Sequence, residues 1–176
     1  SSLSKITMPT GVTTIGQYAF SGCTNLTNLY MGESLKTIGE GAFQHCNMLN
    51  EISIPNSVTR IGNSLFSRCA SLTSVTLPDR MTSIPNAMFM ECGKLTDVNI
   101  PGEVSVIESL AFDGCASLTS IVLPEGVTTI SNAAFNGCSG MTSIVIPDSV
   151  KRIGKSAFAG CSRLTEFTIP AGIGII

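Results

Sequence analysis

Seven cysteines occur in this chain of 176 residues, and the interval between each cysteine and the next is always the same. A phenylalanine stands three residues before every cysteine, and a leucine or methionine stands three residues after it. The cysteines are Cys23, Cys46, Cys69, Cys92, Cys115, Cys138 and Cys161. A period without insertion or deletion indicates one structural unit that stacks on copies of itself. The sequence therefore predicts a repeat solenoid.

Each repeat unit combines three kinds of segment. The first follows the cysteine and reads L-T-x-I-x-I-P, as in residues 118–124. Its alternating β-branched residues predict a strand, which the proline ends because it lacks the N–H donor. The second is a short stretch such as residues 127–130, whose apolar residues lie three apart. The third contains A-F-x-G-C, as in residues 111–115, where we expect a single helical or 3-10 turn.

Stacking places identical positions of successive units above one another at the spacing of neighbouring strands. Each unit then buries its apolar residues against the next, which it cannot do alone. We expect one α/β-type solenoid over residues 1–176, curved and right-handed, with a parallel sheet of short strands on its concave side. The chain holds seven full repeats and part of an eighth, and its uncapped ends predict a piece of a longer array.

The repeat L-x-x-I-x-I followed by P-x-x-V-x-x-I-G-x-x-A-F-x-x-C resembles the BspA-like leucine-rich repeat family along the whole chain. Met141, Ile144 and Ile146 occupy the L-x-x-L-x-L positions of such a repeat. Proline stands where many other leucine-rich repeats carry asparagine, so no asparagine ladder is expected. The resemblance implies a horseshoe-shaped fold. It also implies a secreted or surface-exposed protein of bacteria or protozoan parasites that adheres to host matrix proteins, to other cells or to neighbouring microbes.

Composition argues against two classes of partner. The chain is 43% hydrophobic and 12% charged, with a formal net charge of −2. Nucleic-acid binding requires a basic surface and stacking aromatic rings, whereas this sequence has two tyrosines and no tryptophan. No apolar run approaches the roughly 18 residues that a membrane-spanning helix needs. We expect neither a nucleic-acid partner nor insertion into a membrane.

The cysteines allow three interpretations. A metal site needs clustered ligands, yet every cysteine is a full repeat away from the next one in the sequence. Disulfides between stacked units fit the distance between neighbouring strands, but an odd number of thiols cannot pair completely. We favour a column of buried free thiols that act as small hydrophobic side chains. Burial would also protect such thiols from oxidation in an extracellular protein.

Other titratable residues give little support for catalysis. His45 is the single histidine and lies next to Cys46, but the other six units have no histidine in this place. Six acidic residues between positions 95 and 150 could hold calcium or support hydrolysis. We expect them to be scattered around the coil. The sequence predicts no catalytic residue, no metal and no cofactor, and hence no enzyme.

Strand residues that alternate with core residues point outward on the expected concave sheet, which is the candidate binding face. Most are small and polar, but Val122 and Val145 lie on adjacent units and predict an exposed apolar pair. Tyr30 is a lone aromatic residue toward the other end. The candidate binding residues are Tyr30, Glu51, Thr76, Asp97, Asn99, Val122, Val145 and Glu166.

We expect an extracellular module that binds a protein or mediates adhesion through this face, with a host matrix or cell-surface protein as its partner. Two other roles stay open. The chain could be a structural spacer that projects another domain from a cell surface, or an intracellular interaction scaffold, because free cysteines alone suit the cytosol. The uncapped ends could also mediate self-association.

Overall fold

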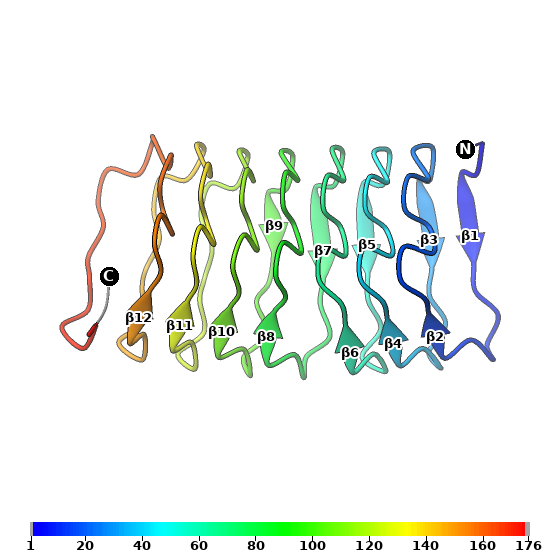
Figure 1. Cartoon of the computed structure of the whole chain (residues 1–176), viewed down its shortest axis with the longest axis horizontal. Coiled ribbons are helices and arrows are strands. Elements are labelled where there is room, and N and C mark those ends of the chain that lie inside the picture. Colours follow the sequence, from blue (N-terminus) through cyan, green and yellow to red (C-terminus); the bar gives the residue numbers. More distant parts are fainter. Residues whose placement is uncertain (1, 175–176) are drawn as a thin grey trace.

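The computed structural model describes residues 2–174, which form a solenoid of short parallel strands (Figure 1). Lys5 pairs with Asn28, and Thr14 pairs with Thr37. All the other strand pairs are offset by the same length of chain, which equals the interval between the cysteines. One repeat in the sequence is therefore one coil of the solenoid, and equivalent side chains of successive coils form columns.

The first ladder of strands consists of β1 (Lys5–Thr7), β3 (Asn28–Tyr30), β5 (Glu51–Ser53), β7 (Ser74–Thr76) and β9 (Asp97–Val98). It continues as a single parallel bridge between Val122 and Val145. These strands confirm the prediction for the segment after the cysteine in the first five coils; residues 118–124 and 141–147 form only the bridge, and residues 164–170 form no strand. The ladder is interrupted between β3 and β5, which belong to separate sheets, and again between β9 and Val122, which no strand pair or bridge joins within the described residues.

A second ladder is formed by the stretch whose apolar residues lie three apart, as in residues 127–130. It consists of β2 (Thr14–Ile15), β4 (Thr37–Ile38), β6 (Arg60–Ile61), β8 (Ser83–Ile84), β10 (Val106–Ile107), β11 (Thr129–Ile130) and β12 (Arg152–Ile153). The sequence alone assigned no strand to this stretch. The second ladder is interrupted between β6 and β8, and we call this interruption the seam.

The turn around A-F-x-G-C differs from the expected helical turn. Between residues 2 and 174 the structure contains no helix, and therefore none that could cross a membrane. Ala87 and Glu91, which flank the turn of one coil, have φ angles of 52° and 58°. Left-handed residues cannot continue a right-handed helix. The N–H groups of Ala87, Phe89 and Glu91 instead all donate to carbonyls of the next coil.

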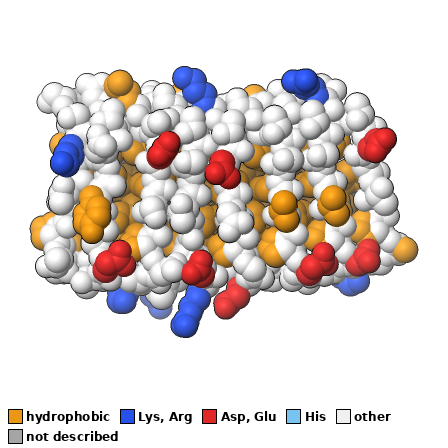
Figure 2. All heavy atoms as spheres, turned by 180° about the vertical axis from the view of Figure 1, so that it is seen from behind, with side chains coloured by type: hydrophobic (Ala, Val, Ile, Leu, Met, Phe, Trp, Pro, Cys, Tyr) orange, Lys and Arg blue, Asp and Glu red, His pale blue; other side chains and the backbone are white. Residues whose placement is uncertain are grey.

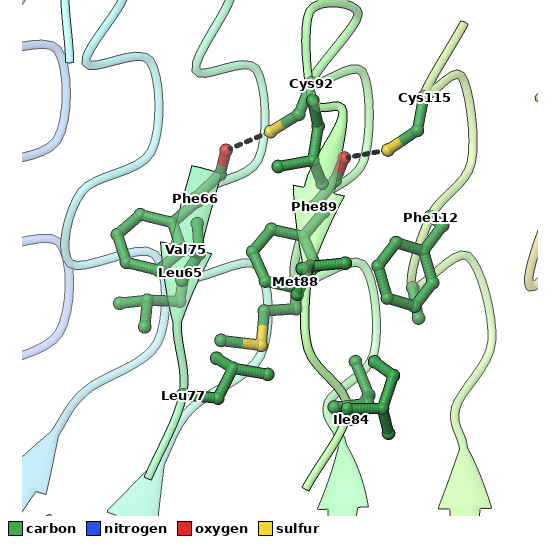
Figure 3. Packing of buried hydrophobic residues seen from close by; sticks show 14 of the residues in the cluster. Leu65, Phe66, Val75, Leu77, Ile84, Met88, Phe89, Cys92, Phe112 and Cys115 are labelled. Carbon is green, nitrogen blue, oxygen red and sulfur yellow. Dashed lines mark hydrogen bonds between the residues drawn. The ribbon is translucent and has the colours of Figure 1, made fainter. Parts of the chain in front are cut away.

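The core is built from columns of identical side chains (Figure 3). Phenylalanine rings of successive coils stack almost parallel: the centroids of Phe112 and Phe135 are 5.2 Å apart with an interplanar angle of 2°. A column of thiols lies beside the rings. The Sγ atom of Cys92 donates a hydrogen bond to the carbonyl oxygen of Phe66 in the preceding coil at 3.1 Å, and Cys115 donates to Phe89 at 3.2 Å.

Candidate binding surface

The outward-facing residues of the first ladder form the candidate surface. Alternation along the strand buries Ile121 and Leu123 and leaves Val122 between them 83% exposed. Val145 on the next coil is 80% exposed and is bridged to Val122 through the backbone. The predicted apolar pair is therefore present on the surface.

The structure distributes seven of the eight candidate residues over three open depressions along the first ladder. Asp97 and Asn99 line one depression together with Val122. Val145 and Glu166 line a second depression on the neighbouring coils. These five residues lie on four successive coils, and we call them the valine region.

The other candidates lie apart from the valine region. Tyr30 and Glu51 line the third depression, at the interruption between β3 and β5. Tyr30 is 61% exposed. Thr76 is exposed on β7, between the two groups, and lines none of the three depressions.

A row of carboxylates borders this face and includes three of the six acidic residues between positions 95 and 150, whereas Asp97, Glu108 and Asp113 lie at other places of the coil. Glu125 and Asp148 are one repeat apart and so occupy the same turn of successive coils, just after the first ladder. The same turn of other coils carries Glu33 and Asp79, with Glu103 one residue further on, and all five are exposed. Figure 2, which views the first ladder from outside, shows acidic side chains along one edge with Lys and Arg side chains beside them, and hydrophobic side chains on the face between polar neighbours.

The cysteine thiols have the properties of unreactive, buried side chains. All seven are free thiols; the five between Cys46 and Cys138 are buried, and the two outer ones are half-buried. Burial raises the pKa of Cys46, Cys92 and Cys138 to about 12, and it raises that of Cys69 and Cys115 as well. A thiol with such a pKa stays protonated near neutral pH and is a poor nucleophile. The column is thus a packing element.

Two further observations concern chemistry in the described part of the chain. His45 adjoins Cys46 in sequence, but its φ of 59° places it at one of the left-handed turn positions. Among residues 2–174, no group of three or more His, Cys, Asp or Glu side chains is placed to hold a metal ion.

A further depression, which the sequence did not predict, lies on the second ladder at the seam. Arg60, Arg80 and Pro85 are among its lining residues. Pro85 is the feature of the sequence that could have indicated this depression, because the equivalent residue of the other coils is glycine, glutamate or serine. Proline inside a ladder removes a hydrogen-bond donor.

The comparison with family models matched the BspA-type leucine-rich repeat region, with six copies, over residues 1–116 and 82–176. Together these ranges include the entire chain. No curated protein matches the sequence significantly.

Solved structures of bacterial proteins share the fold. A leucine-rich repeat protein of Eubacterium ventriosum is 31% identical with a TM-score of 0.85; the match covers 94% of this chain and 44% of that one. The T. pallidum leucine-rich repeat protein is 32% identical with a TM-score of 0.86, over 92% of this chain and 78% of its own. A leucine-rich cell surface protein of Faecalibacterium prausnitzii is 30% identical with a TM-score of 0.55, over 93% and 59%. This chain thus spans less than half of the Eubacterium protein and larger shares of the other two.

Proposed function

Because the chain belongs to the BspA-type leucine-rich repeat family, we propose that it is a non-enzymatic module that binds a protein partner through the valine region. Repeat solenoids characteristically offer extended surfaces of this kind for binding. The single observation that carries the proposal is the exposure of Val122 and Val145 side by side on the first ladder.

Burial of this pair in a complex would supply the apolar centre of an interface. Each fully buried valine contributes on the order of 1.5 kcal/mol or more through the hydrophobic effect. Asp97, Asn99 and Glu166 lie around the pair and would form the polar rim that interfaces typically have. The acidic row along the edge favours a partner with basic side chains at the corresponding border.

We also propose an extracellular setting, with a host matrix or cell-surface protein as the partner. Two observations support it. One of the similar structures is described as a cell surface protein. The thiols of the inner coils are buried, so the fold can keep free cysteines reduced outside the reducing cytosol.

The test is direct binding of the chain to a panel of extracellular matrix and cell-surface proteins. We expect saturable binding by the wild type. The double variant Val122→Glu, Val145→Glu should bind at least about tenfold more weakly, because it would bury two unpaired carboxylates at the apolar centre of the interface. Both substituted side chains are exposed, so the variant should fold normally, which circular dichroism would verify.

The matched control is Ser105→Glu, Thr128→Glu, which adds the same two charges to neighbouring coils on the second ladder. It should bind the partner as the wild type does. Equal binding by the valine variant and the wild type would move the site away from the first ladder. Failure of the wild type to bind any member of the panel would contradict the proposed partner class and favour a spacer role.

A further inference from the structure

We propose that the seam is a second binding site, which accepts an extended peptide segment between β6 and β8 as an added strand. The segment would alternate acidic and apolar side chains. This site lies on the second ladder and is separate from the valine region, so it goes beyond the proposed function.

The seam is a local loss of backbone pairing within an otherwise regular ladder. Elsewhere, the N–H of the residue before each strand donates to the preceding coil, as Thr59 does to Lys36 at 2.9 Å and Thr128 to Ser105 at 2.8 Å. Within the described residues, the equivalent bond from Thr82 to Thr59 is missing at the seam. The arrows of β6 and β8 are further apart in Figure 1 than those of any other neighbours in the second ladder.

Pro85 explains why the seam opens at this coil. In the coils on either side of the seam, the N–H of Gly62 donates to Ile38 at 2.8 Å and that of Glu108 donates to Ile84 at 3.0 Å. Pro85 has no N–H and leaves the carbonyl of Ile61 without this partner. The other coils carry glycine, glutamate or serine at this place, and each of these residues has the N–H that proline lacks.

The remaining contacts between the same two coils are intact. In the turn column, Ser64 donates its N–H to Asn86 at 2.8 Å and Phe66 donates to Met88 at 2.9 Å. In the first ladder, β5 pairs with β7. The opening is thus a stable, one-sided gap that the rest of the fold holds in place.

The gap presents hydrogen-bonding groups of both kinds. Over residues 2–174, no backbone hydrogen bond reaches the N–H groups of Thr82 and Ser83 or the carbonyls of Thr59 and Ile61 across the seam. Donors on β8 therefore face acceptors on β6, as in a parallel pair whose middle strand is absent. An inserted peptide could satisfy both edges, which is how strand addition gains affinity from main-chain bonds.

Side chains at the seam select the chemistry of the peptide. Ile61 and Met81 are only half-buried, whereas their equivalents Ile84 and Val104 are buried. On the outward side, Arg60 and Arg80 are exposed and line the same depression of about 240 Å³. In the described part of the chain the one ion pair joins Arg68 to Glu91, so neither guanidinium has a carboxylate partner.

Alternation along an inserted strand matches this arrangement. Successive side chains of a strand point to opposite faces. On β6 the outward residue is Arg60 and the inward one is Ile61. An added strand would direct its acidic side chains toward the arginines and its apolar side chains toward Ile61 and Met81.

The probe is a fluorescent, end-capped peptide of three Leu-Glu repeats, with Leu-Gln and Leu-Lys peptides of the same length as controls. Anisotropy should show saturable binding of the Leu-Glu peptide alone. Hydrogen exchange at the amides of Thr82 and Ser83 should be fast in the free protein and slow in the complex. Equal binding of the Leu-Lys peptide, or unchanged exchange at both amides, would overturn the proposal.

Two variants test the parts of the site. Arg60→Gln, Arg80→Gln should weaken binding about tenfold, as expected for the loss of two exposed charge pairs. The matched control is Arg152→Gln, which removes an arginine from the equivalent place of an intact coil pair and should bind the peptide as the wild type does. If both variants lost the same binding affinity, the effect would come from the net charge of the protein, and a site at the seam would be contradicted.

Pro85→Gly restores the missing donor and removes the ring. We expect slow exchange at Thr82 and Ser83 without peptide, together with loss of peptide binding. Slow exchange combined with wild-type affinity would show that the peptide binds elsewhere. A single-stranded oligonucleotide that binds the arginines more tightly than the Leu-Glu peptide would overturn the assignment to a peptide.

Discussion

Two left-handed residues in each coil determine the shape of the turn. The second of these positions is glycine in four coils, including Gly137 with a φ of 69°, but it is His45 in another. A residue with a Cβ loses roughly 1–2 kcal/mol in this conformation, while glycine adopts it freely. Side chains at this position therefore lower the stability of their coil.

Exchange of residues at this position should change stability in opposite directions. We expect His45→Gly to raise the free energy of unfolding by about 1 kcal/mol and Gly137→Ala to lower it by about the same amount. The added methyl group at position 137 would meet only ordinary contacts at 3.5 Å, so conformation alone is tested. Urea denaturation of both variants and the wild type would measure the effect, and a loss of stability in both variants would contradict this explanation.

The thiol column predicts a loss of stability in alkaline solution. Burial raises the pKa of Cys92 from its ordinary value of 9.0 to about 12. Between these values the unfolded chain releases a proton that the folded chain keeps, so stability is complete below pH 9 and falls as the pH rises toward 12.

For one such thiol the loss amounts to about 1.4 kcal/mol per pH unit. The variant Cys92→Ala should therefore lose less stability than the wild type between pH 8 and pH 10.5, by about 2 kcal/mol. Urea denaturation at the two pH values provides the measurement. Parallel losses in the two proteins would show that this thiol does not contribute.

At the scale of the element, side-chain columns couple neighbouring coils. Phe89 is fully buried and stacks between Phe66 and Phe112, with centroid distances of 6.0 and 5.3 Å. Phe20 is half-buried and stacks on Phe43 alone. The two rings thus have the same place in the repeat but different surroundings.

Removal of a phenylalanine ring should lower the stability of the protein most in the middle of the phenylalanine column. Phe89→Ala should lower the free energy of unfolding by about 3–5 kcal/mol, the usual range for a buried phenylalanine. Phe20→Ala should cost clearly less because water already reaches that ring. Thermal and urea unfolding would compare the two, and equal losses would show that position along the column has no influence.

Strands also show what the sequence could and could not predict. The alternating residues around Val122 correctly predicted an outward-facing ladder, since burial fixes which side of a strand faces the core. The expected helical turn at residues 111–115 was wrong because nothing in A-F-x-G-C reveals that Leu110 and Gly114 adopt positive φ. The second ladder was not assigned because two-residue strands carry too little alternation to detect.

The binding surface was predictable only in part for a related reason. A constant period places Val122 beside Val145, and the structure confirms the pair. The interruptions of the ladders depend instead on residues that depart from the repeat, such as Pro85 at the seam, and on the separation of two coils, which the repeated positions do not encode. Tyr30 therefore stood out in the sequence only as an isolated aromatic residue, although it lies at such an interruption.

At the scale of the whole molecule, each coil contacts mainly its neighbours. Stability in such a solenoid is close to a sum of coil and interface terms, so unfolding can begin locally and spread. Each coil from the first to the seventh cysteine carries one thiol, which becomes reactive when that coil opens. The reactivity of each thiol therefore reports whether its own repeat has unfolded locally.

Thiol labelling should follow the position of the coil. In the 176-residue chain, we expect Cys161 to react before Cys92 in mild urea, since the former is half-buried and the latter fully buried. Mass spectrometry of peptides after timed labelling would give the order. Simultaneous labelling of all seven thiols would instead show that the solenoid opens in one cooperative step.

The constant offset between paired strands also means that surface positions repeat at a fixed distance along the solenoid. Two residues in one column are separated by a whole number of coils, each adding about 4.8 Å where neighbouring strands are paired. Insertion or removal of one complete repeat between two contact residues would change the distance between them by the thickness of one coil. Every core residue would keep its place in the repeat. Duplication of one repeat during evolution could thus change the distance between two binding contacts on a partner without any substitution in the core.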